Sequence, residues 1–283
     1  MKIIESITEM QQYADQLRAD SKKIGFVPTM GYLHQGHLSL VDIAGENCDT
    51  VVLSIFVNPA QFGPNEDLDS YPRNEGKDIE LAREKGVDVV FLPSADTIYP
   101  DGYQSYVELA HLPNHLCGLS RPVFFKGITT VVTQLFHIVK PHVAVFGEKD
   151  FQQLATIRRM VKDLKFDIEV MGGPIVREPD GLAMSSRNAY LKDHQRKAAL
   201  SLSRSIQHAR QMVADGTTDA TSIIQQVTAI LSEFAENTID YVSICDTETM
   251  DPVSSIEDSA LLAIAVNLNK IRLIDNTVLN RQG

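Results

Sequence analysis

The sequence predicts an α/β protein: a Rossmann-like, doubly wound parallel sheet with a second, smaller α+β domain. Between residues 24 and 171, short apolar runs of strand length alternate with stretches of helical periodicity, which is the pattern of βαβ units. One of these runs, residues 50–57 (TVVLSIFV), is almost continuously apolar, as expected for a strand covered on both faces. Beyond about residue 187, two long helical stretches precede three β-rich ones, which indicates a separate unit.

Each element is expected where the spacing of apolar residues fits it. The strands of the first part are expected at 24–28, 50–57, 87–92, 142–146 and 167–171, with helices over 36–44, 77–85, 128–139 and 151–164. In the second part, helices over 193–215 and 218–236 precede strands 238–245, 260–266 and 271–278. The change of pattern places a boundary within 176–190, and we divide the chain into domains 1–180 and 181–283.

The 283 residues include 26 basic and 37 acidic side chains, a net charge of −11. This balance argues against a nucleic-acid partner, since phosphate binding draws on a surplus of lysine and arginine. No apolar run reaches ~18 residues, so no membrane partner is expected. The three cysteines lack metal-ligand spacing, which favours a reduced, cytoplasmic location. Six histidines also lack metal-like spacing and are interpreted as structural or exposed: His111, His115, His137, His142, His194 and His208.

The most informative segment, residues 28–37 (PTMGYLHQGH), leaves the first expected strand and enters a helix N-terminus. Open α/β sheets bind ligands at such an edge, where backbone N–H groups and the helix dipole favour an anion. Gly36 leaves room for a nucleotide, and His34 and His37 share one helix face, from which both can donate to a phosphate. The alternative is that the two histidines only cap the helix.

Two further segments offer donors for a phosphate. Lys149, within the sequence GEKD after an expected strand, is a point charge for phosphate oxygens. Ser185, Ser186 and Arg187 supply two hydroxyls and a guanidinium suited to developing negative charge. Taken alone, the first segment is equally compatible with a polar turn with an N-cap at Asp150, and the second fits a serine-rich loop that opens a helix better than a binding site.

A fourth segment, FVNPAQF, lies at the end of the expected strand 50–57. Asn58 and Gln61 can orient a polar small molecule through their amides, although Asn-Pro turn chemistry alone explains Asn58. The loop 58–71 is long for a compact domain, which is typical of a functional loop. Because three of the four segments follow parallel strands, one sheet edge is expected to gather them into a site for triphosphate chemistry.

Together these residues resemble a known family. Residues 28–37 are similar to the His-x-Gly-His signature of the class I nucleotidyltransferase superfamily. The ordered set FVNPAQF, YPR (71–73), FGEKD, QQ (152–153) and MSSRN narrows the resemblance to the pantothenate synthetase (pantoate–β-alanine ligase) family. With RLIDN at 272–276, the likeness spans essentially the whole chain.

The resemblance implies a ligase that condenses (R)-pantoate with β-alanine to pantothenate, with ATP as a substrate. The pantoate carboxylate attacks the α-phosphorus of ATP to give pantoyl adenylate and pyrophosphate, and the amine of β-alanine then displaces AMP. The resemblance also implies Mg²⁺ accompanying ATP, a homodimer, an ATP- and pantoate-binding first domain and a C-terminal lid domain.

Carried over to this chain, the resemblance implies roles for individual residues, with His37 as the proton donor. The implied nucleotide-binding residues are Met30, Gly31, Tyr32, Leu33, His34, Gln35, Gly36, His37, Gly147, Glu148, Lys149, Asp150, Val176, Met184, Ser185, Ser186 and Arg187. The implied substrate-binding residues are Asn58, Gln61, Arg121 and Gln153. The implied catalytic residues are His34, His37, Lys149, Ser185, Ser186 and Arg187.

The chain departs from the family pattern in two places. After Arg121 and a proline, the usual glycine and histidine are replaced by Val123 and Phe124. The acidic residue usual before Asp78 is Lys77, so no magnesium ligand is named.

Three other hypotheses stay open: a plain nucleotidyltransferase acting on a phosphorylated precursor, a relative of the aminoacyl-tRNA synthetases, and a non-catalytic nucleotide-binding module. Gln61, Gln153 and the second domain argue against the first hypothesis, and the acidic balance argues against the second. ATP–pyrophosphate exchange that requires pantoate distinguishes the ligase from the nucleotidyltransferase. In a binding module, His34, His37 and Lys149 would be dispensable.

Overall fold

The computed structural model describes residues 1–64 and 66–281. Asn65, within the predicted loop 58–71, and residues 282–283, at the end of the predicted second domain, lie outside the described residues. The fold divides into two compact units. The large unit consists of Met1–Ala110, Arg121–Glu148 and Thr156–Pro174, and the small unit of His111–Ser120, Lys149–Ala155 and Ile175–Gly283.

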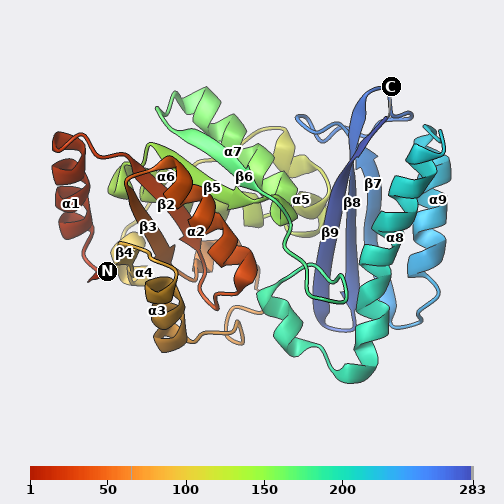
Figure 1. The fold of residues 1–283 in the computed structure, drawn as a ribbon, viewed down its shortest axis with the longest axis horizontal. Coiled ribbons are helices and arrows are strands. Elements are labelled where there is room, and N and C mark those ends of the chain that lie inside the picture. Colours follow the sequence, from red (N-terminus) through yellow and green to blue (C-terminus); the bar gives the residue numbers. More distant parts are fainter. Residues whose placement is uncertain (65, 282–283) are drawn as a thin grey trace. The chain divides into compact units, whose positions relative to one another are not determined.

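Six parallel strands build the sheet of the large unit, in the order β1-β4-β3-β2-β5-β6 (Figure 1). From β2, the chain adds β3 and β4 on one side and β5 and β6 on the other, which confirms the predicted doubly wound sheet. The strands are β1 Lys2–Ile4, β2 Ile24–Thr29, β3 Thr50–Ile55, β4 Val89–Phe91, β5 Val143–Gly147 and β6 Glu169–Gly173.

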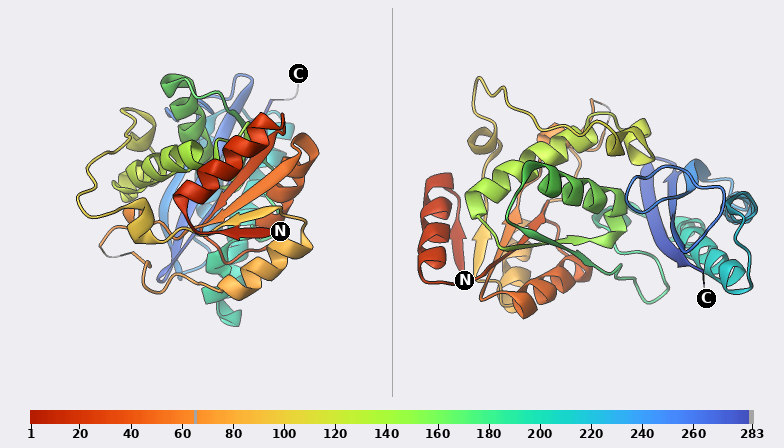
Figure 2. Two further views of the ribbon diagram at one scale, coloured as in Figure 1. Left: turned by 90° about the vertical axis from the view of Figure 1, so that its left-hand side faces the viewer. Right: turned by 90° about the horizontal axis from the view of Figure 1, so that it is seen from above.

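Helices cover both faces of this sheet (Figure 2). Successive side chains of β2 point to opposite faces, and their contacts identify the helices that cover each one. Phe26 packs edge-on against Phe136 of α6, with ring centroids 6.5 Å apart, whereas Val27 belongs to the apolar cluster that contains Leu40 and Val41 of α2. The helices are α1 Ile7–Ala19, α2 Gln35–Asn47, α3 Glu75–Glu84, α6 Phe124–Val139 and α7 Phe151–Leu164.

The N-terminus and the start of α6 differ from the predicted elements. β1 and α1 were not predicted because β1 has three residues, of which only Ile4 is buried, and α1 buries only Met10 and Ala14. α6 begins before the predicted residue 128 and includes Gly127, a poor helix former. A Cβ at Gly127 would lie 2.3 Å from the backbone oxygen of Ala60, so glycine allows α6 to pack directly on the loop after β3.

The small unit contains an antiparallel three-stranded sheet in the order β7-β8-β9, which confirms the predicted α+β character. Ile206 of α8 and Ile223 of α9 belong to one buried cluster with Ile264 of β8, so the two helices cover one face of this sheet. The elements are α8 Arg196–Ala214, α9 Ala220–Leu231, β7 Asn237–Cys245, β8 Ser259–Leu268 and β9 Ile271–Asn280.

Short elements complete the two units. They are the helices α4 Ala95–Ile98 and α5 Cys117–Ser120 and the 3₁₀ turns η1 Pro59–Gln61, η2 Leu112–Asn114, η3 Glu148–Asp150, η4 Ser186–Tyr190 and η5 Asp193–Gln195. Within the described ranges, none of the helices has both the length and the apolar character that crossing a bilayer requires.

Candidate active site

The carboxyl ends of β2, β3 and β5 lie at one edge of the large sheet, because the three strands are parallel neighbours. The strand order reverses between β2 and β5, and open α/β sheets bind ligands at such a point. The segments 28–37, 56–62 and 147–150 begin at these three strand ends. The prediction that one sheet edge gathers these segments is therefore confirmed for 28–37, for 56–62 and for Gly147 and Glu148, whereas Lys149 and Asp150 belong to the small unit.

A buried carboxylate holds the turn that follows β2. Asp78 of α3, only 2% exposed, accepts hydrogen bonds from the backbone N–H groups of Tyr32 and Leu33, both at 2.7 Å. Gly31 has a φ of 79°, and a Cβ there would lie 2.9 Å from Oδ2 of Asp78, so glycine permits this close approach. Burial raises the pKa of Asp78, although the two amide donors and Lys77 act in the opposite direction.

Replacing Asp78 with alanine is expected to lower the free energy of unfolding by about 2–4 kcal/mol, because two amide N–H groups lose their acceptor. Nucleotide affinity should fall as well, since the turn loses its support. Denaturant unfolding and calorimetric titration with ATP measure the two effects. Glu80→Ala, at an exposed position of the same helix, is the control. Equal stability of the two variants would show that the carboxylate does not hold the turn.

His34 and His37 cap α2 through the same ring atom. Nδ1 of His34, the N-cap residue, accepts from the Gly36 N–H at 3.1 Å, and Nδ1 of His37 accepts from the His34 N–H at 3.3 Å. The two ring centroids are 4.0 Å apart, with 31° between the ring planes. Because Nδ1 accepts in both rings, a neutral imidazole carries its proton on Nε2 and donates from that atom. The capping alternative is therefore realised, and the cap uses Nδ1 of each ring, not Nε2.

Asn58 and Gln61 are buried, at 1% and 6% exposure, and bond to each other. Nδ2 of Asn58 donates to Oε1 of Gln61 and to the Gly127 carbonyl, both at 3.1 Å. Its Oδ1 accepts from a backbone N–H at 3.2 Å and from the Tyr99 hydroxyl at 2.9 Å. These four bonds engage the whole amide, which favours a role for Asn58 in positioning Gln61. Nε2 of Gln61 donates to Sδ of Met30 at 2.9 Å, so Gln61 contacts the segment after β2.

Arg121 is paired with a carboxylate within the large unit. Its Nε donates to both carboxylate oxygens of Glu66 at 3.0 Å, and its Nη2 bonds to Glu66 and, at 3.2 Å, to the Gln61 carbonyl. The guanidinium carbon lies 3.7 Å from the ring centroid of Phe124. Phe124, one of the residues that depart from the family pattern, thus stacks on Arg121. An anion that binds Arg121 has to compete with Glu66.

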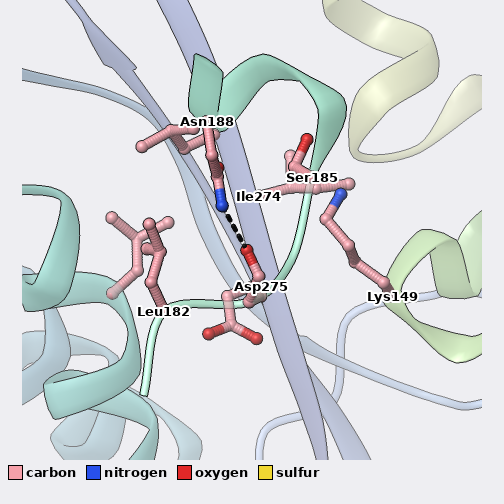
Figure 3. Close-up of a pocket in the computed structure, with 9 residues that line it drawn as sticks. Lys149, Leu182, Ser185, Asn188, Ile274 and Asp275 are labelled. Carbon is pink, nitrogen blue, oxygen red and sulfur yellow. Dashed lines mark hydrogen bonds between the residues drawn. The ribbon is translucent and has the colours of Figure 1, made fainter. Parts of the chain in front are cut away.

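In the small unit, Lys149 lines a small pocket and extends toward the loop that carries Ser185 (Figure 3). The Lys149 ammonium nitrogen lies 3.9 Å from a carboxylate oxygen of Asp150. Among the residues that the structure describes, Oδ1 of Asn188 is a buried atom of this lining with no hydrogen-bond partner. An unpaired buried acceptor in a pocket of about 10 Å³ indicates a place for one water molecule. The full lining is Lys149, Leu182, Ala183, Ser185, Asn188, Leu202, Leu273, Ile274 and Asp275.

A buried ion pair supports the serine-containing loop beside this pocket. Arg177 donates to the two carboxylate oxygens of Asp275 in β9 at 2.7 and 2.9 Å, and the side chain of Asp275 is 1% exposed. Ser185 is the N-cap of η4 and accepts from the Arg187 N–H at 3.3 Å. Nδ2 of Asn188 donates to the Ala183 carbonyl at 3.1 Å, drawn in Figure 3. The loop is therefore anchored to the small sheet.

The predicted site residues are divided between the two units. In the small unit, the Met184 N–H donates to the Val176 carbonyl at 2.9 Å, and Gln153 is half-buried on α7. The group in the large unit is Met30, Gly31, Tyr32, Leu33, His34, Gln35, Gly36, His37, Asn58, Gln61, Arg121, Gly147 and Glu148. The group in the small unit is Lys149, Asp150, Gln153, Val176, Met184, Ser185, Ser186 and Arg187. That the two groups bind one ligand stays a prediction.

Sequence reasoning missed the residues that support these groups from a distance. Asp78 lies 45 positions from Leu33, Glu66 lies 55 positions from Arg121, and Asp275 lies 98 positions from Arg177. No local spacing links such partners. The one available signal was Asp78 itself, a carboxylate on the apolar side of a predicted helix.

His111 and His115, interpreted from the sequence as structural or exposed, lie close to each other and to a carboxylate. Their Nε2 atoms lie 3.3 Å apart, and Oδ1 of Asp251 lies 3.1 Å from the first and 3.5 Å from the second. Asp251 is 140 positions from His111, so spacing along the chain did not reveal the group.

Comparison with known proteins agrees with this fold and these motifs. The family model described as pantoate-beta-alanine ligase matches residues 2–278. A pantothenate synthetase from Syntrophobacter fumaroxidans is 58% identical over 279 residues, with 99% of each chain covered. The solved pantothenate synthetase from Thermus thermophilus has a TM-score of 0.93 at 41% identity, covering 98% of this chain and 99% of that one.

A second solved structure carries ligands. It is the pantoate-beta-alanine ligase from Francisella tularensis complexed with beta-gamma ATP and beta-alanine, with a TM-score of 0.80 at 33% identity, covering 100% of this chain and 99% of that one. Both the family model and these relatives extend over nearly the whole sequence. The chain therefore belongs to the pantoate-beta-alanine ligase family of C–N ligases.

Proposed function

We propose that this chain condenses (R)-pantoate with β-alanine to pantothenate through pantoyl adenylate, consuming ATP and releasing AMP and pyrophosphate. The observation that carries the proposal is the capped histidine pair at the reversal point of the large sheet. Both rings use Nδ1 as an acceptor, so both Nε2 atoms donate at a helix N-terminus. Such an arrangement suits a substrate on which negative charge develops.

In the first step, a carboxylate oxygen of pantoate attacks the α-phosphorus of ATP, and the bond to the β-phosphate breaks with its electron pair leaving on pyrophosphate. Charge then spreads over the α-phosphate oxygens and the leaving group. His34 and His37 donate to these oxygens from Nε2, and stabilisation that exceeds ground-state binding lowers the barrier. Lys149 and the hydroxyls of Ser185 and Ser186 serve the leaving phosphates.

In the second step, the amine of β-alanine attacks the acyl carbon of pantoyl adenylate. The C–N bond forms, the acyl C–O bond breaks, and the amine proton is lost as AMP departs. Adenylation is needed because a free carboxylate offers only a very poor leaving group. Gln61 and Gln153 hold pantoate so that the reacting atoms meet at high effective concentration, and Asn58 keeps the Gln61 amide in place.

Mg²⁺ is expected to accompany ATP, but the described residues near the histidine pair do not form a dedicated site for it. Mg²⁺ prefers several oxygen ligands. Both carboxylate oxygens of Asp78 already accept backbone N–H groups, and Lys77 occupies the preceding position, where an acidic residue was expected. The phosphate oxygens and water would therefore hold the ion, and no step is assigned to it.

Residues 1–180 form the ATP- and pantoate-binding domain and residues 181–283 the lid. The chain acts as a homodimer, which light scattering of the purified protein tests. Its location is cytoplasmic, in keeping with Cys48, Cys117 and Cys245, which form no disulfide in the described part of the chain.

Omitting each substrate in turn tests the reaction. AMP should form only when ATP, pantoate and β-alanine are all present, and exchange of labelled pyrophosphate into ATP should require pantoate but no β-alanine. β-Alanine alone is the matched control and should support no exchange. Exchange driven by a phosphorylated precursor in place of pantoate would overturn the proposal in favour of a plain nucleotidyltransferase.

A further inference from the structure

The group formed by His111, His115 and Asp251 lies wholly within the small unit and has no part in the reaction proposed above. It offers two imidazole nitrogens and one carboxylate oxygen, all within 4.8 Å of one another. The three separations are 3.1, 3.3 and 3.5 Å. In a tetrahedral zinc site with ligand bonds of about 2.0–2.1 Å, neighbouring ligand atoms lie about 3.3 Å apart. The three atoms therefore have the separations of one face of such a tetrahedron.

The segment that carries the two histidines is held in place by a buried side chain. Nε2 of Gln152 donates to the carbonyls of Leu112 and His115 at 2.9 and 2.8 Å, and its Oε1 accepts from the Cys117 N–H at 3.0 Å. The 3₁₀ turn η2 between the histidines brings both rings to the same side, with centroids 4.7 Å apart. The two histidines thus belong to a turn that the hydrogen bonds of Gln152 hold in place.

The segment that carries Asp251 is braced as well. Oδ1 of Asp246 accepts from the N–H groups of Glu248 and Thr249 at 2.9 and 2.8 Å, and the Asp246 N–H donates to the Asp251 carbonyl at 2.9 Å. The Asp251 N–H donates to Oγ1 of Thr249 at 3.2 Å. The carboxylate of Asp251 therefore lies on a hydrogen-bonded turn beside the histidines. Little conformational entropy of this turn remains to be lost when a ligand binds.

We propose that His111, His115 and Asp251 bind one Zn²⁺ ion and tie the turn 111–117 to the turn 246–251. Two imidazoles and one carboxylate suit Zn²⁺, whereas Mg²⁺ and Ca²⁺ prefer oxygen ligands throughout. The side chains of His111 and Asp251 are 59% and 52% exposed, so water completes the tetrahedron and the ion enters from the surface. The site is structural and is independent of the ligase reaction.

Calorimetric titration of the untagged, chelator-stripped full chain with Zn²⁺ tests the site. One equivalent should bind, and His111→Ala or Asp251→Asn should weaken the affinity at least ~100-fold, since loss of an outer-shell partner alone costs about 10–100-fold. His208→Ala, at an exposed position of α8, is the matched control and should bind like the wild type. Bound Zn²⁺ should also raise the unfolding temperature of the wild type and leave that of His111→Ala unchanged.

Substitution with Co²⁺ supplies a second measurement. The wild type should show the intense visible absorption of tetrahedral Co²⁺, which Zn²⁺ abolishes and excess Mg²⁺ does not. The proposal is overturned if the wild type binds no Zn²⁺ in saturable fashion, if His111→Ala binds as tightly as His208→Ala, or if Mg²⁺ displaces Co²⁺. Either of the first two results would leave the group as an ion pair between histidines and a carboxylate, and the third would show a site without preference for Zn²⁺.

Discussion

Replacing His37 with asparagine is expected to lower turnover at least ~100-fold, the effect of removing one transition-state donor. The asparagine side chain places an oxygen near the position of Nδ1, so it keeps the acceptor for the His34 N–H and with it the cap of α2. It removes Nε2, which carries the proton in the tautomer that the cap requires. Steady-state kinetics should therefore show a large loss of turnover in His37→Asn, whereas its unfolding temperature should stay close to that of the wild type.

The reciprocal variant, His37→Gln, distinguishes the donor from the cap. Glutamine can place an amide N–H near the position of Nε2 and loses the capping acceptor. It should retain more activity than His37→Asn and lose about 1 kcal/mol of stability, the usual worth of a cap. The opposite ranking, with an active asparagine variant and an inactive glutamine variant, would mean that His37 acts only on the helix.

Replacing Lys149 with methionine is expected to lower pantoate-dependent pyrophosphate exchange at least ~100-fold, because a charged donor to the leaving phosphates is lost. Methionine fills similar space, so the pocket shared with Ser185 and Asn188 keeps its shape. Lysine at this position acts on phosphates, so the reaction of preformed pantoyl adenylate with β-alanine should be less affected. Measuring the two half-reactions separately checks this difference.

Lys162→Met is the control for loss of a positive charge, since Lys162 is exposed on α7, the helix that follows Lys149. It should leave exchange unchanged. A loss of less than about threefold in Lys149→Met, which corresponds to under 1 kcal/mol of transition-state stabilisation, would remove Lys149 from the proposed machinery.

The order of strands and helices was predictable where burial is continuous or periodic. β3, at Thr50–Ile55, is buried along nearly its whole length, and its apolar run is plain in the sequence. β1 was not predictable because pairing with β4 supplies the order that its three residues do not encode. The early start of α6 depends on the contact between Gly127 and Ala60, which joins positions far apart in the chain.

The site was predictable where its chemistry lies in one short segment. The spacing of His34 and His37 gave both the helix cap and the pair of donors, because residues three apart on a helix face the same way. The anchors of these segments were not predictable. Asp78 fixes the turn after β2 from 45 positions away, and Arg121 is engaged by Glu66 across 55 positions. Such contacts are products of tertiary packing, and apart from the position of Asp78 on the apolar side of its helix they leave no periodic signal.

The small unit takes Lys149–Ala155 from the middle of the chain, although Gly147 and Glu148 belong to the large unit. Lys149 and the Ser185 loop therefore belong to the same compact unit, where they line one pocket and Asn276 of β9 donates to the Lys149 carbonyl at 2.8 Å. The histidine pair belongs to the large unit. Transplanting residues 175–281 alone onto another scaffold would accordingly leave this lysine behind.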